Sequence, residues 1–371
     1  MDIINEYLKY MVEKDASDIY FTVGVPPAFR IEGVVSVYGD RALSAEDTKN
    51  FAYAIMNERQ RAKFEEEMEM NLAIFQPEYG RFRVNIFRQK SFIGIVIRQI
   101  KLTIKTIDDW GLPAIMKDIC MSKRGLVLVV GATGSGKSTT LAALIDYRNS
   151  NQPGHIITIE DPVEFVHQHK MSVVTQREVG FDTLSFYNAL KNTLRQAPDV
   201  ILIGEIRDAE TMEDAITFAE TGHLCLATLH ANNANQALER ILNFFPIERH
   251  LQIYMQLSLN IRSIISQRLI PTVEGKRAAA IEILLDSPRV KDLILKGEIT
   301  LLKETMAESY FEGMQTFDQH IFDMYQAGLL DLDNAIAYAD SPNDVRLKIK
   351  MAEMKPDEGE EKKDSGLKLK L

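Results

Sequence analysis

The chain has 371 residues and a formal net charge of −10 at pH 7. This acidic balance disfavours DNA or RNA as the main partner, because proteins that neutralise phosphate backbones are usually basic. The amino-terminal stretch lacks the pattern of a signal peptide, and no apolar run approaches the roughly 18 residues that a membrane span needs. We therefore expect a cytoplasmic protein of two or three domains.

The first hundred residues predict a small α+β domain. Ser44 and Asp47 have the spacing of a capping box and open one of its helices. Short β-rich runs between glycines and prolines predict its strands. The expected elements are a helix at 3–13, short strands within 18–37, a helix from Ser44 to Met56, and β-rich runs at 80–88 and 91–98.

A second domain of repeated strand, turn and helix follows. Strands that alternate with helices predict an α/β core with a mostly parallel sheet. Beyond Ala234 the pattern predicts a largely helical part. The expected strands are Leu126–Val130, Ile156–Ile159, Val200–Ile203 and Leu224–Thr228. The predicted organisation is a domain at residues 1–100, a linker at 101–112, the core at 113–350, and a charged, disordered tail at 351–371.

One glycine-rich segment matches the phosphate-binding P-loop without a gap. It follows the strand that ends at Val130 and precedes a helix expected at Ser138–Tyr147, which is the context that this loop needs. Lys137 should reach the β- and γ-phosphates of a nucleotide, and Ser138 should bind Mg²⁺. The predicted nucleotide-binding residues are Gly131, Ala132, Thr133, Gly134, Ser135, Gly136, Lys137, Ser138 and Thr139.

Acidic residues follow two of the predicted strands, at the edge where a parallel sheet opens to its ligand. Glu205 comes after the strand at 200–203 and is placed beside the magnesium. The other strand ends in Glu160, Asp161 and Glu164, which could orient an attacking water or hold Mg²⁺ through its waters. A solvated acidic turn is the alternative for this second group.

Two histidines, His223 and His230, bracket the strand at 224–228. A histidine in such a place is more often a packed core residue than a catalytic one. No cysteine or acidic residue completes a metal-ligand spacing around either of them. Their role stays open on the residues alone.

Four motifs in this order resemble those of the type II/IV secretion ATPase superfamily. They are a Walker A motif at Gly131–Ser138, an Asp box at Ile157–Glu164, a Walker B motif at Val200–Arg207 and a His box at Gly222–His230. The pattern from Asp15 to Pro27 and the run from Arg81 to Phe87 are similar to the amino-terminal domain of pilus retraction ATPases. The resemblance implies an α/β, RecA-like P-loop core after a small α+β, PAS-like domain.

The resemblance also implies a homo-hexameric motor that binds ATP and Mg²⁺ between subunits and drives pilus retraction in twitching motility. In such rings the glutamate that matches Glu164 polarises the attacking water, and the one that matches Glu205 supports Mg²⁺ and the γ-phosphate. Arginines of the amino-terminal domain reach the γ-phosphate from the neighbouring subunit. The candidates for these trans arginines are Arg83, Arg98 and, as a third, Arg88.

Two departures from the PilT-type pattern resemble the PilU-type branch of the family. Residues 289–296 read Arg-Val-Lys-Asp-Leu-Ile-Leu-Lys, and residues 195–199 read Arg-Gln-Ala-Pro-Asp. The implied partners are a PilT-type motor and the pilus platform protein of the inner membrane. Three other hypotheses stay open: an accessory subunit that does not need its own hydrolysis, a secretion or pilus-assembly ATPase of the same fold, and a nucleic-acid translocase, which the acidic charge disfavours.

Overall fold

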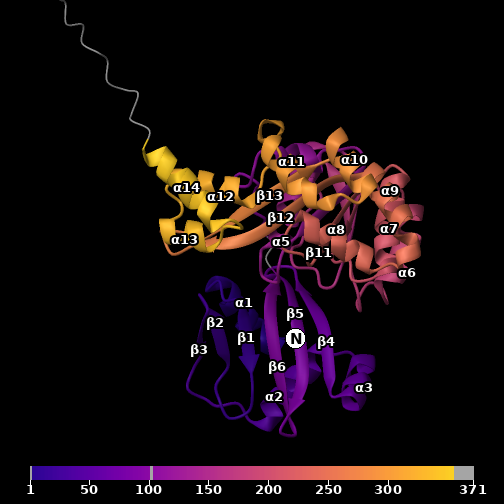
Figure 1. Cartoon of the computed structure of the whole chain (residues 1–371). Coiled ribbons are helices and arrows are strands. Elements are labelled where there is room, and N and C mark those ends of the chain that lie inside the picture. Colours follow the sequence, from indigo (N-terminus) through magenta and orange to yellow (C-terminus); the bar gives the residue numbers. More distant parts are fainter. Residues whose placement is uncertain (1, 101–102, 355–371) are drawn as a thin grey trace, which may run out of the picture. The chain divides into compact units, whose positions relative to one another are not determined.

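A computed structural model describes residues 2–100 and 103–354 (Figure 1). The chain divides into two compact units, each built from three stretches of sequence. The first takes Met1–Asp109, Ala114–Val127 and Lys137–Leu229, and the second takes Trp110–Pro113, Leu128–Gly136 and His230–Leu371. No helix in the described ranges is long and apolar enough to cross a membrane.

Two of the predicted segments fall partly outside the described residues. The predicted linker includes residues 101–102, and the predicted tail includes residues 355–371. Both of these stretches lie outside the described residues. The first residues of that tail belong to helix α14 (Pro342–Glu353), so regular structure reaches beyond the expected boundary at residue 350.

An antiparallel sheet of six strands forms the first part of the first unit. Its strand order is β3-β2-β1-β6-β5-β4, and every neighbouring pair is antiparallel. The strands are β1 (Asp18–Phe21), β2 (Ala28–Ile31), β3 (Val34–Val37), β4 (Glu69–Gln76), β5 (Gly80–Gln89) and β6 (Phe92–Ile100). The helices are α1 (Asp2–Glu13), α2 (Ala45–Ile55) and α3 (Glu58–Glu67). The α+β character expected of this region is confirmed.

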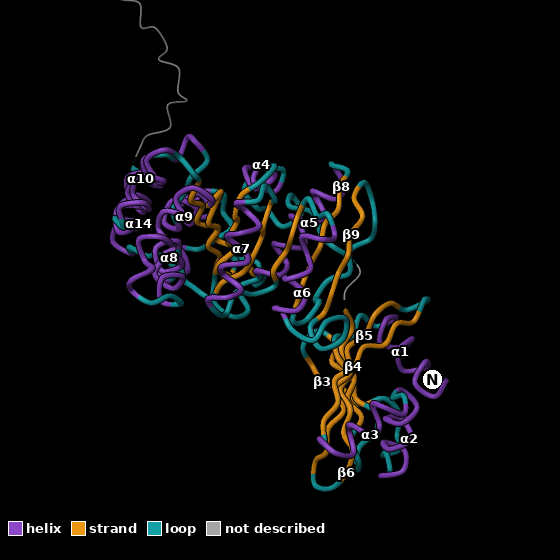
Figure 2. The backbone as a smooth tube through the Cα atoms, turned by 90° about the vertical axis from the view of Figure 1, so that its right-hand side faces the viewer, coloured by secondary structure: helices purple, strands orange, loops and turns teal. Residues whose placement is uncertain are grey.

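The three helices α1 to α3 lie on the same side of this sheet (Figure 2). Successive side chains of a strand point to opposite faces, and β5 accordingly alternates between buried and half-buried residues over most of its length. One hydrophobic core joins Leu8 of α1, Phe51 of α2 and Phe64 of α3 to the inner face of the sheet. The capping box predicted for Ser44 and Asp47 is present at the start of α2.

Parallel strands carry the α/β character of the rest of the first unit. β8 pairs in parallel with β9 and β10, and β10 pairs in parallel with β11. The strands are β8 (Gly154–Glu160), β9 (Ser172–Glu178), β10 (Val200–Ile203) and β11 (Leu224–Leu229), and the helices are α4 (Ile115–Cys120), α5 (Lys137–Asn151), α6 (Phe186–Thr193), η1 (Leu194–Gln196) and α7 (Ala209–Glu220). With β7 (Gly125–Val130), β12 (Ile261–Pro271) and β13 (Arg277–Leu285), the seven-stranded sheet has the order β13-β12-β7-β11-β10-β8-β9. The expected mostly parallel sheet is confirmed.

The second unit is largely helical beyond Ala234, as predicted, but it also has two strands that the prediction did not include. It contains a long antiparallel pair, β12 (Ile261–Pro271) and β13 (Arg277–Leu285). Every residue of β12 is buried or half-buried, its arginine, serine and glutamine side chains included. Apolar and polar residues therefore do not alternate along it with the two-residue period by which strands are recognised. The helices of this unit are α8 (Ala234–Asn243), η2 (Ile247–Arg249), α9 (His250–Asn260), α10 (Pro288–Lys296), η3 (Ile299–Leu301), α11 (Leu302–Glu308), η4 (Tyr310–Glu312), α12 (Phe317–Gln326), α13 (Leu332–Ala337) and α14.

The end of the β12–β13 pair is covered by helices α12, α13 and α14. Ile270 of β12 and Phe317 of α12 belong to one buried cluster there. The guanidinium carbon of Arg268 lies 3.6 Å from the centre of the Phe317 ring, and its Nη2 lies 2.8 Å from the Asp340 carboxylate. A cation–π contact and an ion pair thus fasten β12 to this helical cluster.

The core of the amino-terminal sheet offers a test of the packing. Phe82 on β5 is fully buried, whereas Phe75 on the neighbouring strand β4 is 68% exposed. We expect Phe82→Ala to lower the free energy of unfolding by about 3–5 kcal/mol, because it opens a cavity in the core. The matched Phe75→Ala should change it by no more than about 0.5 kcal/mol. Urea unfolding of the two full-length variants checks this, and equal losses would contradict the packing.

Candidate active site

The glycine-rich segment joins the buried strand β7 to helix α5, which begins at Lys137. A Cβ atom on Gly131 would lie 2.4 Å from the Ser135 Oγ and 2.5 Å from the Gln267 carbonyl oxygen, so only glycine fits there. Gly136 has a φ of +89°, and its Cβ would lie 2.7 Å from the Gln267 Nε2. Such a loop keeps backbone N–H groups turned toward a bound anion.

The side chain of Gln267, on β12, forms a hydrogen bond with the backbone of this loop. Its Nε2 donates a hydrogen bond of 2.7 Å to the Ser135 carbonyl oxygen. The Ser135 Oγ is buried and has no hydrogen-bond partner among the described residues. A buried hydroxyl without a partner costs free energy unless a ligand supplies one. The loop therefore fits the phosphate oxygens of a nucleotide.

The structure brings Lys137 into the field of two predicted catalytic carboxylates. Burial lowers the pKa of the Lys137 ammonium group, and the negative charges of Glu205 and Glu164 oppose that change. Glu164 is exposed and Glu205 is half-buried, so both can meet a ligand or a water molecule. These three residues, predicted separately from three motifs, share one neighbourhood.

Glu160 and Asp161 differ in their surroundings although they are neighbours in the chain. The Glu160 Oε1 accepts hydrogen bonds from the Thr158 Oγ1 at 2.7 Å and from the Gln176 Nε2 at 3.2 Å. Burial raises the pKa of Glu160 to about 6, although these hydrogen bonds act in the opposite direction. Asp161 is exposed. The Glu160 side chain is thus held in one position at the sheet edge by its hydrogen bonds, whereas the Asp161 side chain is accessible to charged groups from solvent.

Arg207 was not singled out by the sequence, although it closes the Walker B motif. Its guanidinium lies 2.7 Å from the Glu205 carboxylate and 3.6 Å from that of Asp161. The hydrogen bond to Glu205 raises the pKa of Arg207. Arg207 therefore links the carboxylates that follow β10 and β8. Its position two residues after Glu205 is the sequence feature from which this pairing could have been predicted.

The two predicted histidines lie at opposite ends of β11. His223 precedes the strand, and its Nδ1 lies 3.1 Å from the Thr221 Oγ1 and 3.2 Å from the Phe218 carbonyl oxygen at the end of α7. His230 follows the strand and lines a pocket of about 330 Å³ together with the start of the glycine-rich loop. Only His230 is at the carboxyl edge of the sheet.

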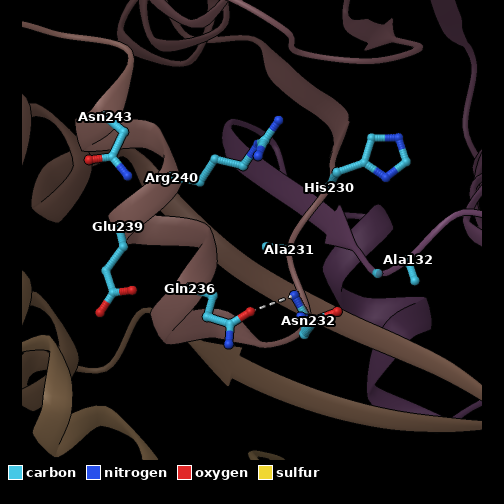
Figure 3. A pocket seen from close by; sticks show the side chains of 9 residues that line it. Ala132, His230, Ala231, Asn232, Gln236, Glu239, Arg240 and Asn243 are labelled. Carbon is cyan, nitrogen blue, oxygen red and sulfur yellow. Dashed lines mark hydrogen bonds between the residues drawn. The ribbon is translucent and has the colours of Figure 1, made fainter.

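The pocket beside His230 is polar (Figure 3). The Gln236 Oε1 accepts a hydrogen bond from the Asn232 backbone N–H at 3.2 Å. A second hollow of about 570 Å³ adjoins the same loop. The first is lined by Gly131, Ala132, His230, Ala231, Asn232, Gln236, Glu239, Arg240 and Asn243, and the second includes Thr133, Gln267, Arg277 and Tyr338.

The three candidate trans arginines have different partners within the chain. The Arg83 Nε lies 3.8 Å from the buried Glu178 carboxylate, whereas the Arg98 Nε donates a 2.8 Å hydrogen bond to Asp18. Arg83 and Arg98 lie directly opposite each other on β5 and β6.

Arg88 is near the other end of β5, where it pairs with Glu65 at 2.5 Å and its guanidinium faces the Phe64 ring. Five residues of extended strand, about 17 Å, separate it from Arg83. Arg83 interacts electrostatically with Glu164 and Asp161, two of the predicted site carboxylates, whereas Arg88 pairs with Glu65.

Comparison with known proteins identifies the family of this chain. The family described as type II/IV secretion system protein matches residues 1–292. The type IV pilus ATPase PilU of Pseudomonas aeruginosa is 55% identical over 345 residues, which cover 93% of this chain and 90% of that protein. The PilT retraction ATPase of the same organism is 41% identical over 339 residues, which cover 91% of this chain and 98% of that protein.

A solved structure agrees with these relatives. The crystal structure of the pilus retraction motor PilT with bound ADP is 41% identical, covers 93% of this chain and 99% of its own, and gives a TM-score of 0.87. The chain therefore belongs to the type II/IV secretion system protein family, and it is more similar to the PilU relative than to the PilT relative.

Proposed function

We propose that this chain hydrolyses ATP and that the hydrolysis drives or assists retraction of a type IV pilus. The observation that carries the proposal is the shared neighbourhood of Lys137, Glu164 and Glu205. The supporting comparison is the similarity over most of the chain to proteins named as type IV pilus ATPases. ATP would bind through the loop Gly131–Ser138, as the orphaned Ser135 Oγ and the tight glycine turns suggest.

Each catalytic residue has a separate task in this mechanism. Lys137 and the N–H groups at the start of α5 stabilise the negative charge that spreads over the transferred phosphoryl group. Glu164 polarises the water whose oxygen attacks the γ-phosphorus while the bond to the β-phosphate oxygen breaks. Ser138 and Glu205 are the residues that would hold Mg²⁺, which neutralises phosphate charge when bound. Arg207 holds the Glu205 carboxylate in place.

The motor would work as a homo-hexamer whose nucleotide is shared between subunits. An arginine from the neighbouring subunit, Arg83 or Arg98, would reach the γ-phosphate and couple its hydrolysis to the geometry of the ring. The ring would act on the pilus platform of the inner membrane from the cytoplasmic side, together with a PilT-type motor. The identity of 55% to the PilU relative, against 41% to the PilT relative, supports the assignment to the PilU-type branch.

Lys137→Ala tests the phosphate loop. We expect a loss of about 100-fold or more in kcat for ATP, because one preorganised cation at the phosphates is removed. A phosphate-release assay on the purified protein, alone and mixed with a PilT-type motor, measures this. The exposed Glu274→Gln is the control and should leave the rate unchanged. Unaltered turnover of Lys137→Ala would remove the loop from the mechanism.

Glu164→Gln tests the water-polarising role. We expect kcat to fall by about 100- to 10,000-fold, the usual contribution of a general base. Binding of a fluorescent ATP analogue should persist, because the Glu164 side chain is exposed and the substitution keeps its shape. A variant that keeps its kcat would assign the water to another carboxylate.

The biological role needs a strain that lacks this chain. Twitching motility and the number of surface pili should return to normal with the wild-type chain and fail to do so with Lys137→Ala, because hydrolysis does the mechanical work. Twitching plates and pilus counts, with and without the PilT-type motor, measure this. Full rescue by Lys137→Ala would contradict the motor and favour an accessory subunit.

A further inference from the structure

Glu178 is a buried carboxylate that the mechanism above does not use. It is the last residue of β9 and lies opposite Glu160 in the parallel register of β8 and β9. Its side chain is 1% exposed. Glu178 is therefore sealed within the same sheet edge that presents the catalytic carboxylates.

Two arginines of β5 are the counter-ions of Glu178. The Arg81 Nη2 lies 3.5 Å from the Glu178 Oε2, and the Arg83 Nε lies 3.8 Å from its Oε1. The Val163 backbone N–H donates to the Oε2 at 3.4 Å. A carboxylate buried this deeply needs such positive charge, because desolvation of an unpaired ion costs several kcal/mol or more.

The contact with Arg83 is an ion pair without a hydrogen bond. The Glu178 Oε1 has no hydrogen-bond partner among the described residues, and 3.8 Å is beyond hydrogen-bonding distance. Burial raises the pKa of Glu178, and the two arginines only partly offset that change. Arg83 is thus attracted to Glu178 but not clamped by it, so a stronger anion can compete for the same guanidinium.

Arg83 also lies in the field of the catalytic edge. Burial lowers the pKa of Arg83, and the charges of Glu178, Glu164 and Asp161 oppose this. The guanidinium is therefore held beside the carboxylates of its own chain. The same side chain is a candidate for contact with a γ-phosphate, which carries more negative charge than a carboxylate and offers more acceptor oxygens.

We propose that Glu178 is a positioning residue that holds Arg83 in its own subunit, in competition with the phosphates of the nucleotide. This inference rests on the proposed ATPase function. Nucleotide binding must then draw Arg83 away from Glu178, and the apparent affinity for ATP is reduced by the fraction of subunits in which Arg83 is still held. Glu178 sets how readily Arg83 is released.

Glu178→Gln removes the charge and keeps the shape of the side chain. If Arg83 is held in about nine subunits of ten, the KM for ATP should fall by up to about tenfold, while kcat changes less than about twofold. Glu178→Asp keeps the charge and should restore the wild-type KM. Glu67→Gln, which removes the carboxylate of an exposed ion pair with Lys63, is the matched control and should leave KM unchanged.

Arg83→Ala shows whether Glu178 acts through Arg83. In the Arg83→Ala background, Glu178→Gln should no longer change KM, so the two substitutions should be strongly non-additive. A fall in kcat with an unchanged KM for Glu178→Gln, or a KM effect that persists without Arg83, would overturn the proposal. A loss of folding in Glu178→Gln that Glu178→Asp does not share would also overturn it, because the charge would then be structural.

Binding can be measured separately from turnover. Titration of a fluorescent non-hydrolysable ATP analogue should show tighter binding to full-length Glu178→Gln than to the wild type, by the same factor as KM. This measurement does not need hydrolysis, so a wild-type chain without ATPase activity would refute the proposed function while the titration still decides the role of Glu178. Equal affinity of the two proteins would end the proposal.

Discussion

The phosphate loop keeps its shape because the backbone of β12 passes within contact distance of it. Gly131 and Gly136 both lie against Gln267, and neither leaves room for a Cβ atom. The Gln267 side chain then donates to the carbonyl oxygen of Ser135. The N–H groups of the loop are therefore oriented before any ligand arrives, and little reorganisation energy is spent when phosphate binds.

Charged side chains of the first unit form several neighbouring pairs of opposite charge. Lys137 faces Glu205 and Glu164, Arg207 bridges Glu205 and Asp161, and Arg83 faces Glu178. A triphosphate bound as proposed would compete with these carboxylates for the same cations. Its binding energy then depends on the difference between two sets of ion pairs, and small changes of geometry can shift the balance.

The sequence predicted those parts of the fold and site whose signals are local. The P-loop and the carboxylates after β8 and β10 could be found because each motif follows an apolar strand directly. The antiparallel pair β12–β13 was missed because its residues are buried on both faces and show no alternation. Gln267 and Glu178 could not be found, because their partners lie about 130 and 95 residues away in the chain and no spacing rule connects them.

The stacking of Arg268 on Phe317 has a mechanical consequence. Arg268 directly follows Gln267 in β12. The contact of β12 with α12 therefore lies one peptide unit from the side chain that donates a hydrogen bond to the Ser135 carbonyl oxygen. Close-packed interiors transmit displacement rather than absorb it. A force on helices α12 to α14 would therefore be transmitted through β12 to the phosphate loop. Mechanical load would then change the affinity of the loop for a nucleotide bound as proposed.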